Sequence, residues 1–153
     1  MFGKKSDSNE AIFSNYTDYI MHLLMNLVGP AAPGHNIELA VDLESDRASV
    51  YFDDTRIYFT DSLVGPSVGL MELQAPIFRS FKPSAELISE LALINKVLVS
   101  VNLVPESEAS FDLVVSADLL LTGHPNEDAI NVAVILTTIA DVHTELYNRF
   151  VSM

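Results

Sequence analysis

Apolar residues recur at helical spacing near the start of the chain, after a polar stretch at residues 1–8 that is expected to form a disordered tail. Asp7 and Glu10, three positions apart, resemble a capping pair that opens a helix. The apolar positions, which follow at spacings of three and four, are Ile12, Tyr16, Tyr19, Ile20, Leu23 and Leu27. This pattern predicts a first helix that stops at Gly29-Pro30, with a connector up to Asn36.

Four short runs of β-branched and aromatic residues then predict an antiparallel meander. The runs are Ile37–Asp42, Ala48–Asp53, Arg56–Thr60 and Gly69–Ala75. They are separated by residues 44–46, by Asp53-Asp54 and by Gly65-Pro66, all of which are typical of turns.

A second helix is predicted after the meander, with Pro83 at its first position and Ser84 and Glu86 in its first turn. It should end near Leu98, with Leu87, Leu91, Ile94 and Leu98 on one face. Two further strands, at about residues 99–104 and 111–121, flank an acidic turn at 105–108 and predict a β-hairpin.

The last helix should begin with the polar turn at residues 126–128 and run to about Phe150. Its main apolar face comprises Val132, Leu136, Ile139, His143, Leu146 and Phe150. Ile130 and Val134 widen this face, which is typical either of a deeply buried helix, the interpretation we favour, or of a helix with a second partner surface. Leu91 and Leu136 are both expected in the core.

These elements predict an α+β fold in the order helix, antiparallel meander, helix, β-hairpin, helix, with the sheet packed against helices. The chain has 153 residues, of which 49% are hydrophobic, so residues 9–153 are expected to fold as one domain. It has no cysteine, which excludes disulfides, thiolate zinc sites and a cysteine nucleophile.

Charge limits the partners that the chain can bind. Eight Lys and Arg residues against 21 Asp and Glu give a formal net charge of −13, and the basic residues form no stripe, so neither nucleic acid nor an anionic membrane is expected to bind. The N-terminal residues lack the apolar core of a secretory signal, Phe2 does not fit N-myristoylation, and the apolar stretches are shorter than a membrane span. We therefore expect a cytoplasmic protein.

Two stretches resemble a known family. Residues 85–104, AELISELALINKVLVSVNLV, combine an apolar helix containing Leu91 and Asn95 with a strand, and residues 111–150 combine the strand FDLVVSADLLL with a long closing helix. Together with the order of elements, they resemble the YbjN-like or type III secretion chaperone-like family, whose pattern has three strands before the middle helix where this sequence has four. The resemblance implies a small sheet with helices against it, often dimeric, that binds other proteins, and it implies no catalytic residues.

Residues 65–69, GPSVG, match the G-x-S-x-G pattern of a hydrolase nucleophile elbow, and Asp118 and His143 follow Ser67 in the required order. An elbow requires a helix directly after the serine. Residues 70–73 are instead predicted as a strand, so a Gly-Pro turn is the preferred interpretation.

Asp42, Glu44 and Asp46 alternate like the start of a calcium loop, with Asp53 at the twelfth position. Arg47 occupies the sixth position, where such loops have glycine, so a solvated connection between strands is favoured.

The histidines give weak metal signals. His22 and Asp18 share one helix face, but two ligands do not make a site. His35 and His124 stand in connectors, and His143 is predicted to be a partly buried core or interface residue, because neighbours such as Asp141 and Glu145 point elsewhere.

Four aromatic residues of the meander, Tyr51, Phe52, Tyr58 and Phe59, could stack on bases in another setting, but at this net charge they are predicted to be core and sheet surface.

No catalytic, cofactor or metal site is predicted from these patterns. The leading hypothesis is a non-enzymatic protein-binding module, chaperone-like or adaptor-like and homodimeric. The alternatives are a small serine hydrolase that uses Ser67, or a regulator that binds a small ligand or a metal.

Overall fold

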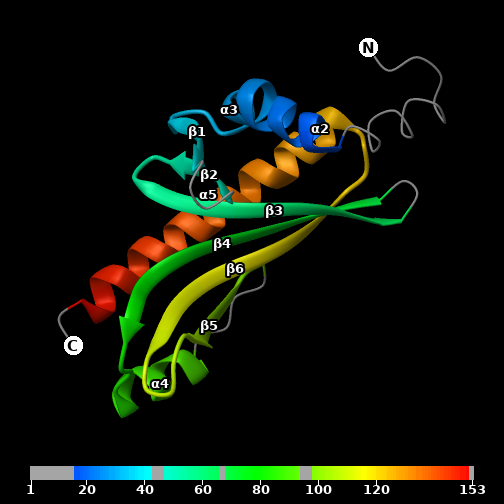
Figure 1. The fold of residues 1–153 in the computed structure, drawn as a ribbon. Coiled ribbons are helices and arrows are strands. Elements are labelled where there is room, and N and C mark those ends of the chain that lie inside the picture. The colour runs from blue at the N-terminus through cyan, green and yellow to red at the C-terminus, as the bar shows by residue number, and fades with distance from the viewer. Residues whose placement is uncertain (1–15, 43–46, 66–67, 94–97, 152–153) are drawn as a thin grey trace.

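The computed structural model describes residues 16–42, 47–65, 68–93 and 98–151. It contains one six-stranded antiparallel sheet with strand order β1-β2-β3-β4-β6-β5 (Figure 1). The strands are β1 (Ile37–Asp42), β2 (Arg47–Phe52), β3 (Thr55–Gly65), β4 (Val68–Phe81), β5 (Ser100–Pro105) and β6 (Phe111–Leu121). The predicted α+β fold is therefore confirmed.

The sheet is a meander extended by a hairpin. Strands β1 to β4 pair in sequence order, and the β5–β6 hairpin adds to β4 through β6. The chain therefore crosses from β4 to the far edge strand β5, and helix α4 (Ala85–Leu93) lies in that connection.

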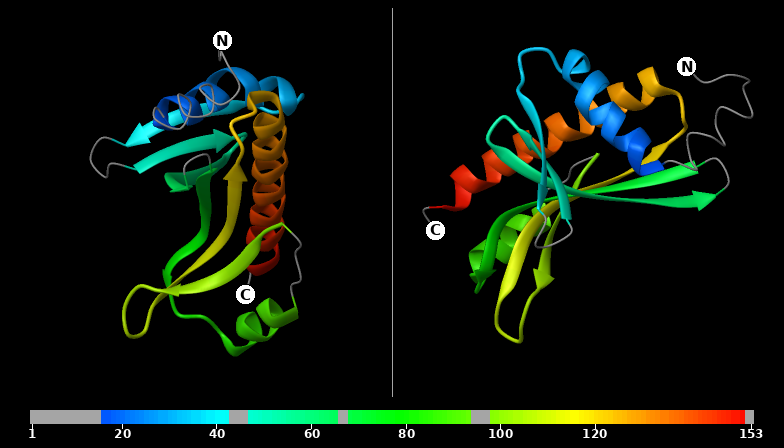
Figure 2. Two further views of the ribbon diagram at one scale, coloured as in Figure 1. Left: turned by 90° about the vertical axis from the view of Figure 1, so that its right-hand side faces the viewer. Right: turned by 45° about the horizontal axis from the view of Figure 1, so that its top comes forward.

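Helix α5 (Pro125–Phe150) covers one face of the sheet, and among residues 16–42, 47–65, 68–93 and 98–151 no helix lies on the other face (Figure 2). Side chains alternate between the two faces along each strand, so a single face receives the apolar residues. Residues of this inner face that are buried include Val50, Ile57, Met71, Leu73, Leu113, Val115 and Leu121. They pack against α5 residues such as Val132, Leu136, Ile139 and Leu146 in one core.

The first helical segment differs from its prediction. It consists of α2 (Tyr16–His22), a π-helical stretch η1 (Leu23–Leu27) and α3 (Val28–Ala31), so the helix does not stop at Gly29-Pro30. Pro30 stands in the last turn of this continuous segment, after the π-helical stretch, and its missing N–H leaves one carbonyl of the preceding turn without a helical donor. Asp7, Glu10 and Ile12 lie outside the described residues.

The start of α4 also differs. The helix begins at Ala85, and Ser84 is its N-cap: the backbone N–H of Leu87 donates to Ser84 Oγ at 3.1 Å. Pro83 therefore precedes the helix, although it was predicted at the first helical position. The predicted end near Leu98 involves residues 94–97, which are outside the described ranges.

Strand β4 is twice as long as predicted, because it continues past Pro76 to Phe81. The pairing with β6 shifts register between Pro76 and Phe78. A proline is tolerated at such a bulge, since the ladder is already interrupted there. The extension places Arg79 on the sheet.

A buried carboxylate attaches α5 to the end of β6. Asp128 accepts hydrogen bonds from the backbone N–H groups of Thr122 (3.1 Å) and Gly123 (2.9 Å), and from the hydroxyls of Thr122 (3.2 Å) and Tyr19 (2.5 Å). Asp128 is fully buried, as such a bonded carboxylate can be. The network joins α2, the loop after β6 and the start of α5.

Candidate interaction surface on the open face of the sheet

The face of the sheet turned away from α5, here called the open face, has none of the described helices over it (Figure 2). Its residues follow from the alternation along each strand and from the cross-strand register. They include Ser49, Tyr51, Arg56, Tyr58, Thr60, Glu72, Gln74, Ser116, Asp118, Leu120, Ser100, Asn102 and Val104. This surface is therefore mainly polar, with isolated apolar residues such as the exposed Leu120.

Two arginines and two tyrosines form a cluster on this face, which we call the Arg–Tyr cluster: Tyr51, Arg56, Tyr58 and Arg79. The guanidinium of Arg56 lies 4.8 Å from the ring centroid of Tyr58 and 5.6 Å from that of Tyr51, its direct cross-strand partner. The guanidinium of Arg79 lies 5.6 Å from the Tyr58 ring centroid. These separations are within the range of cation–π attraction.

Hydrogen bonds fix both arginines. Arg56 Nε donates to Ser49 Oγ at 3.0 Å, and this hydroxyl donates to the carbonyl of Ala40 at 3.4 Å. The Arg56 side chain thereby covers Ser49, which explains why a serine on the open face is fully buried. Arg79 Nη2 donates to the Tyr58 hydroxyl at 3.3 Å. Contacts within the chain therefore hold both guanidinium groups in place.

The cluster is unusual in its charge. In the described part of the chain neither Arg56 nor Arg79 forms an ion pair with a carboxylate, whereas Arg149 pairs with Glu90. Each guanidinium has five N–H groups, of which one is used in the hydrogen bond to Ser49 or to Tyr58. In a chain of net charge −13, two cations at one tyrosine ring without carboxylate partners give this part of the surface a local positive charge.

Acidic residues flank the cluster on the same face. Glu38 faces Tyr51 across the β1–β2 pair, and Glu72 faces Asp118 across the β4–β6 pair. Thr60 donates to Glu72 at 3.3 Å. The positive region is therefore short and bordered by negative charge on both sides.

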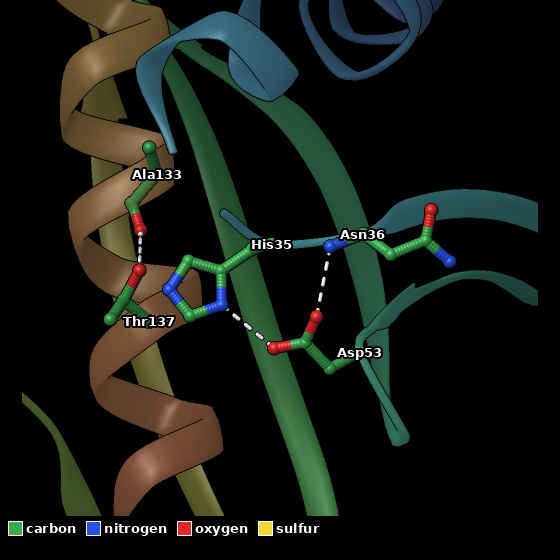
Figure 3. Close-up of polar contacts among 5 residues, drawn as sticks. All are labelled: His35, Asn36, Asp53, Ala133 and Thr137. Atoms are coloured by element: carbon green, nitrogen blue, oxygen red, sulfur yellow. Dashed lines mark hydrogen bonds and ion pairs between the residues drawn. The ribbon is translucent and has the colours of Figure 1, made fainter. Parts of the chain in front are cut away.

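A second polar group supports the β2–β3 turn next to the cluster (Figure 3). Asp53 accepts a hydrogen bond from the backbone N–H of Asn36 at 2.8 Å and one from His35 Nδ1 at 2.7 Å. The bond from Asn36, and after it that from His35, lowers the pKa of Asp53 below its usual value. Asp53 has a positive φ of 53°, as aspartate can in a tight turn. The pair has a structural role, since it fastens this turn to the connector before β1.

The structure does not have the arrangement that a serine hydrolase with Ser67 as nucleophile would need. Strand β3 ends at Gly65 and β4 begins at Val68, with these two residues paired, so a strand and not a helix follows position 67. Ser67 itself lies outside the described residues. Asp118 is on the open face, whereas His143 is on α5 at the inner face, where its Nε2 donates to the Pro76 carbonyl at 3.0 Å. The sheet separates the two proposed partners of the serine.

The calcium pattern is also dispersed. Asp42 lies opposite Arg47 in the strand register, at one end of the β1–β2 hairpin. Asp53 lies beyond the other end of β2, which over six strand residues is roughly 20 Å away. Glu44 and Asp46 are outside the described ranges. Among the residues that the structure describes, no three His, Cys, Asp or Glu side chains are grouped to hold a metal.

The remaining histidines have ordinary surroundings. His22 contacts Asn26 through Nδ1 at 3.0 Å on the first helical segment, and both are exposed. His124 is exposed at the N-cap of α5 without a side-chain capping bond. His143 is partly buried, and it stacks on Tyr147 with ring centroids 6.5 Å apart.

Helix α5 has an apolar strip that the core does not cover. Ile130 and Val134 are 55% and 46% exposed, so the prediction of a deeply buried helix is wrong at these two positions. By length and composition alone, α5 is the one described helix apolar enough to span a membrane, and half of the relevant window is buried inside the molecule. Core helices meet the same criteria.

The aromatic residues of the meander divide between the faces as predicted. Phe52 and Phe59 are buried in the core, and Tyr51 and Tyr58 are partly buried on the open face. Arg79 was not placed by the sequence analysis, because it lies beyond Ala75, where the fourth strand was expected to end.

Comparison with family models, with curated proteins and with solved structures finds no match to this chain.

Proposed function

We propose that this protein is a non-enzymatic protein-binding module, chaperone-like or adaptor-like, that acts in the cytoplasm and contacts its partner through the open face of the sheet. The observation that supports this most strongly is the ordered Arg–Tyr cluster on a face that none of the helices in the described part of the chain covers. Tyrosine and arginine are the residues that dominate the binding energy of protein interfaces, together with tryptophan.

The geometry of the open face suits a protein partner better than a small molecule. The cluster lies on a sheet surface where Tyr51, Arg56 and Tyr58 are only partly covered, and the groove beside Tyr58 and Gln74 is shallow, with a volume of about 140 Å³. Small-ligand sites are usually deeper and enclose most of the ligand. A broad surface with rigid aromatic anchors instead fits a protein interface.

The proposal also includes a homodimer. Ile130 and Val134 are exposed residues of α5, and α5 packs against the inner face of the sheet, so pairing through this helix would leave the open face of each copy accessible. Such a dimer would use the same patch of both copies, as a two-fold interface does.

The experiment is isolation of a partner followed by reconstitution. A protein that co-purifies from native lysate is produced separately, and its dissociation constant is measured with wild type and with Tyr58→Ala. We expect a complex of defined stoichiometry that Tyr58→Ala weakens at least about tenfold, because truncation of a tyrosine that acts as an interface hot spot costs about 2 kcal/mol or more.

Tyr147→Ala is the matched control. Tyr147 is an exposed tyrosine on α5, away from the open face, and it stacks on Phe78. Thermal unfolding first establishes that Tyr58→Ala and Tyr147→Ala are both folded. Tyr147→Ala should then bind the partner with the affinity of wild type. Equal loss in both variants, or loss only in Tyr147→Ala, contradicts the proposed surface, and esterase activity or metal-dependent stabilisation of the wild type would favour the alternatives.

A further inference from the structure

We infer that the Arg–Tyr cluster recognises a short acidic segment of the partner protein, with carboxylates bound by Arg56 and Arg79. This inference rests on the proposed function and gives the chemistry of its partner.

The donors are suited to carboxylates. A guanidinium has a planar set of N–H groups that can bind both oxygens of a carboxylate. Arg56 uses its Nε for Ser49, which leaves its two terminal NH₂ groups for a ligand. Arg79 donates one N–H of its Nη2 to the hydroxyl of Tyr58, which leaves its other N–H groups for a ligand. Both groups lie at the same tyrosine ring, so two neighbouring carboxylates of one segment can be bound together.

The order of the cluster lowers the cost of binding. Long cationic side chains normally lose rotamer freedom when they bind, which weakens exposed ion pairs. Here the Tyr51 and Tyr58 rings and the Ser49 hydroxyl already hold Arg56, and Tyr58 holds Arg79. The interaction with an incoming carboxylate therefore loses less entropy than at a free surface arginine.

The surroundings favour a short acidic stretch over a long polyanion. Glu38 on one side, and Glu72 and Asp118 on the other, share the open face with the cluster. A nucleic acid or a long acidic tract would extend over these carboxylates and be repelled, in addition to the repulsion by the net charge of −13. The segment should therefore have acidic residues at its centre and neutral residues at its flanks.

The test uses a short synthetic peptide with central glutamates, neutral flanks and a fluorescent label, and the same peptide with glutamine in place of glutamate. Fluorescence anisotropy gives the affinity for wild type, Arg56→Gln, Arg79→Gln and Arg149→Gln. The last variant is the control: it removes the same charge from the same chain, but at an arginine that already pairs with Glu90. A single-stranded oligonucleotide is the probe for the nucleic acid alternative.

We expect wild type to bind the glutamate peptide and not the glutamine peptide, with binding that weakens as salt increases. Arg56→Gln and Arg79→Gln should each weaken it about tenfold, and Arg149→Gln should not. Equal effects of all three variants, no binding to the glutamate peptide, or tighter binding to the oligonucleotide would overturn the inference. If the peptide fails while the reconstituted partner complex still depends on Tyr58, the inference fails and the proposed function stands; if that complex also fails, the proposed function fails.

Discussion

The hydroxyl of Tyr19 donates a hydrogen bond to the buried carboxylate of Asp128, which lies 109 positions later in the chain. Asp128 accepts three further bonds from Thr122 and Gly123, so the network connects the first helical segment to the start of α5. Asp128→Ala should lower the free energy of unfolding by about 2–4 kcal/mol, because it leaves buried donors without acceptors. Tyr19→Phe should lower it by about 1–3 kcal/mol. Urea unfolding measures both changes.

Asp141→Ala is the control for this network. It removes an exposed carboxylate from the middle of the same helix, and it should leave stability unchanged or slightly raised because alanine has the higher helix propensity. If Asp141→Ala lowered the free energy of unfolding as much as Asp128→Ala, the negative charge on the helix, and not the hydrogen-bond network of Asp128, would account for the stabilisation.

The core prediction distinguishes two leucines. Leu136 is fully buried, so Leu136→Ala should lower the free energy of unfolding by about 2–5 kcal/mol. Leu91 was also expected in the core, but it is only partly buried at the edge of the core, and Leu91→Ala should cost about 1–2 kcal/mol. Glu106→Ala and Glu108→Ala, both exposed after β5, should change stability by less than about 0.5 kcal/mol. Turn variants that unfold more readily than Leu136→Ala would contradict the described core.

The Asp53 carboxylate predicts a specific pH dependence. Its folded pKa is lowered by the backbone N–H of Asn36 and by His35, so its contribution to stability is fully present above the unfolded pKa of about 3.9. That contribution is lost as the pH falls through the lowered folded pKa. The difference in stability between wild type and Asp53→Asn should therefore be constant near neutral pH and shrink in acid. Asparagine is the appropriate replacement, since it tolerates the positive φ at this position; a difference that grows in acid would refute the assignment.

The exposed strip on α5 predicts the oligomeric state. Light scattering should give about twice the chain mass of 16.8 kDa, and Ile130→Glu or Val134→Glu should give the monomer without loss of stability, because both side chains are exposed in the single chain. Thr144→Glu, also exposed on α5, is the matched control and should remain dimeric. A wild-type mass of one chain from micromolar to millimolar concentration would exclude the dimer.

Ser67→Ala should leave stability and partner binding unchanged, because position 67 lies between two directly paired strands and not before a helix. Loss of a measured hydrolytic activity in a folded Ser67→Ala protein would restore the hydrolase alternative.

The strand pattern was predictable wherever turn residues bounded a β-branched or aromatic run. Ile37–Asp42 and Phe111–Leu121 form strands with the predicted bounds. Two of the errors lie at prolines. The first helix was predicted to stop at Gly29-Pro30, and the fourth strand was predicted to end at Ala75, directly before Pro76. Pro30 instead stands in the last turn of the first helical segment, and Pro76 stands at a bulge of β4. Local sequence does not show that neighbouring elements already satisfy or interrupt the hydrogen bonds at those positions.

The Arg–Tyr cluster was predictable only in part. Alternation along residues 56–59 places Arg56 and Tyr58 on one face and Ile57 and Phe59 on the other, and the sequence contains that signal. Arg79 joins them only because β4 continues beyond its bulge, which requires the long-range pairing with β6. The burial of Asp128 and its hydrogen bonds could not be predicted either, since a position in a polar first turn of a helix is typical of an exposed residue.

The most direct test of the central claim is a nuclear magnetic resonance titration of the isotope-labelled protein with its purified partner. The account predicts that amide shifts change at Tyr51, Arg56, Tyr58 and Gln74, on the open face, while those of exposed α5 residues such as Thr144 and Asn148 remain in place. Changes confined to α5, with the open-face amides unaffected, would contradict it.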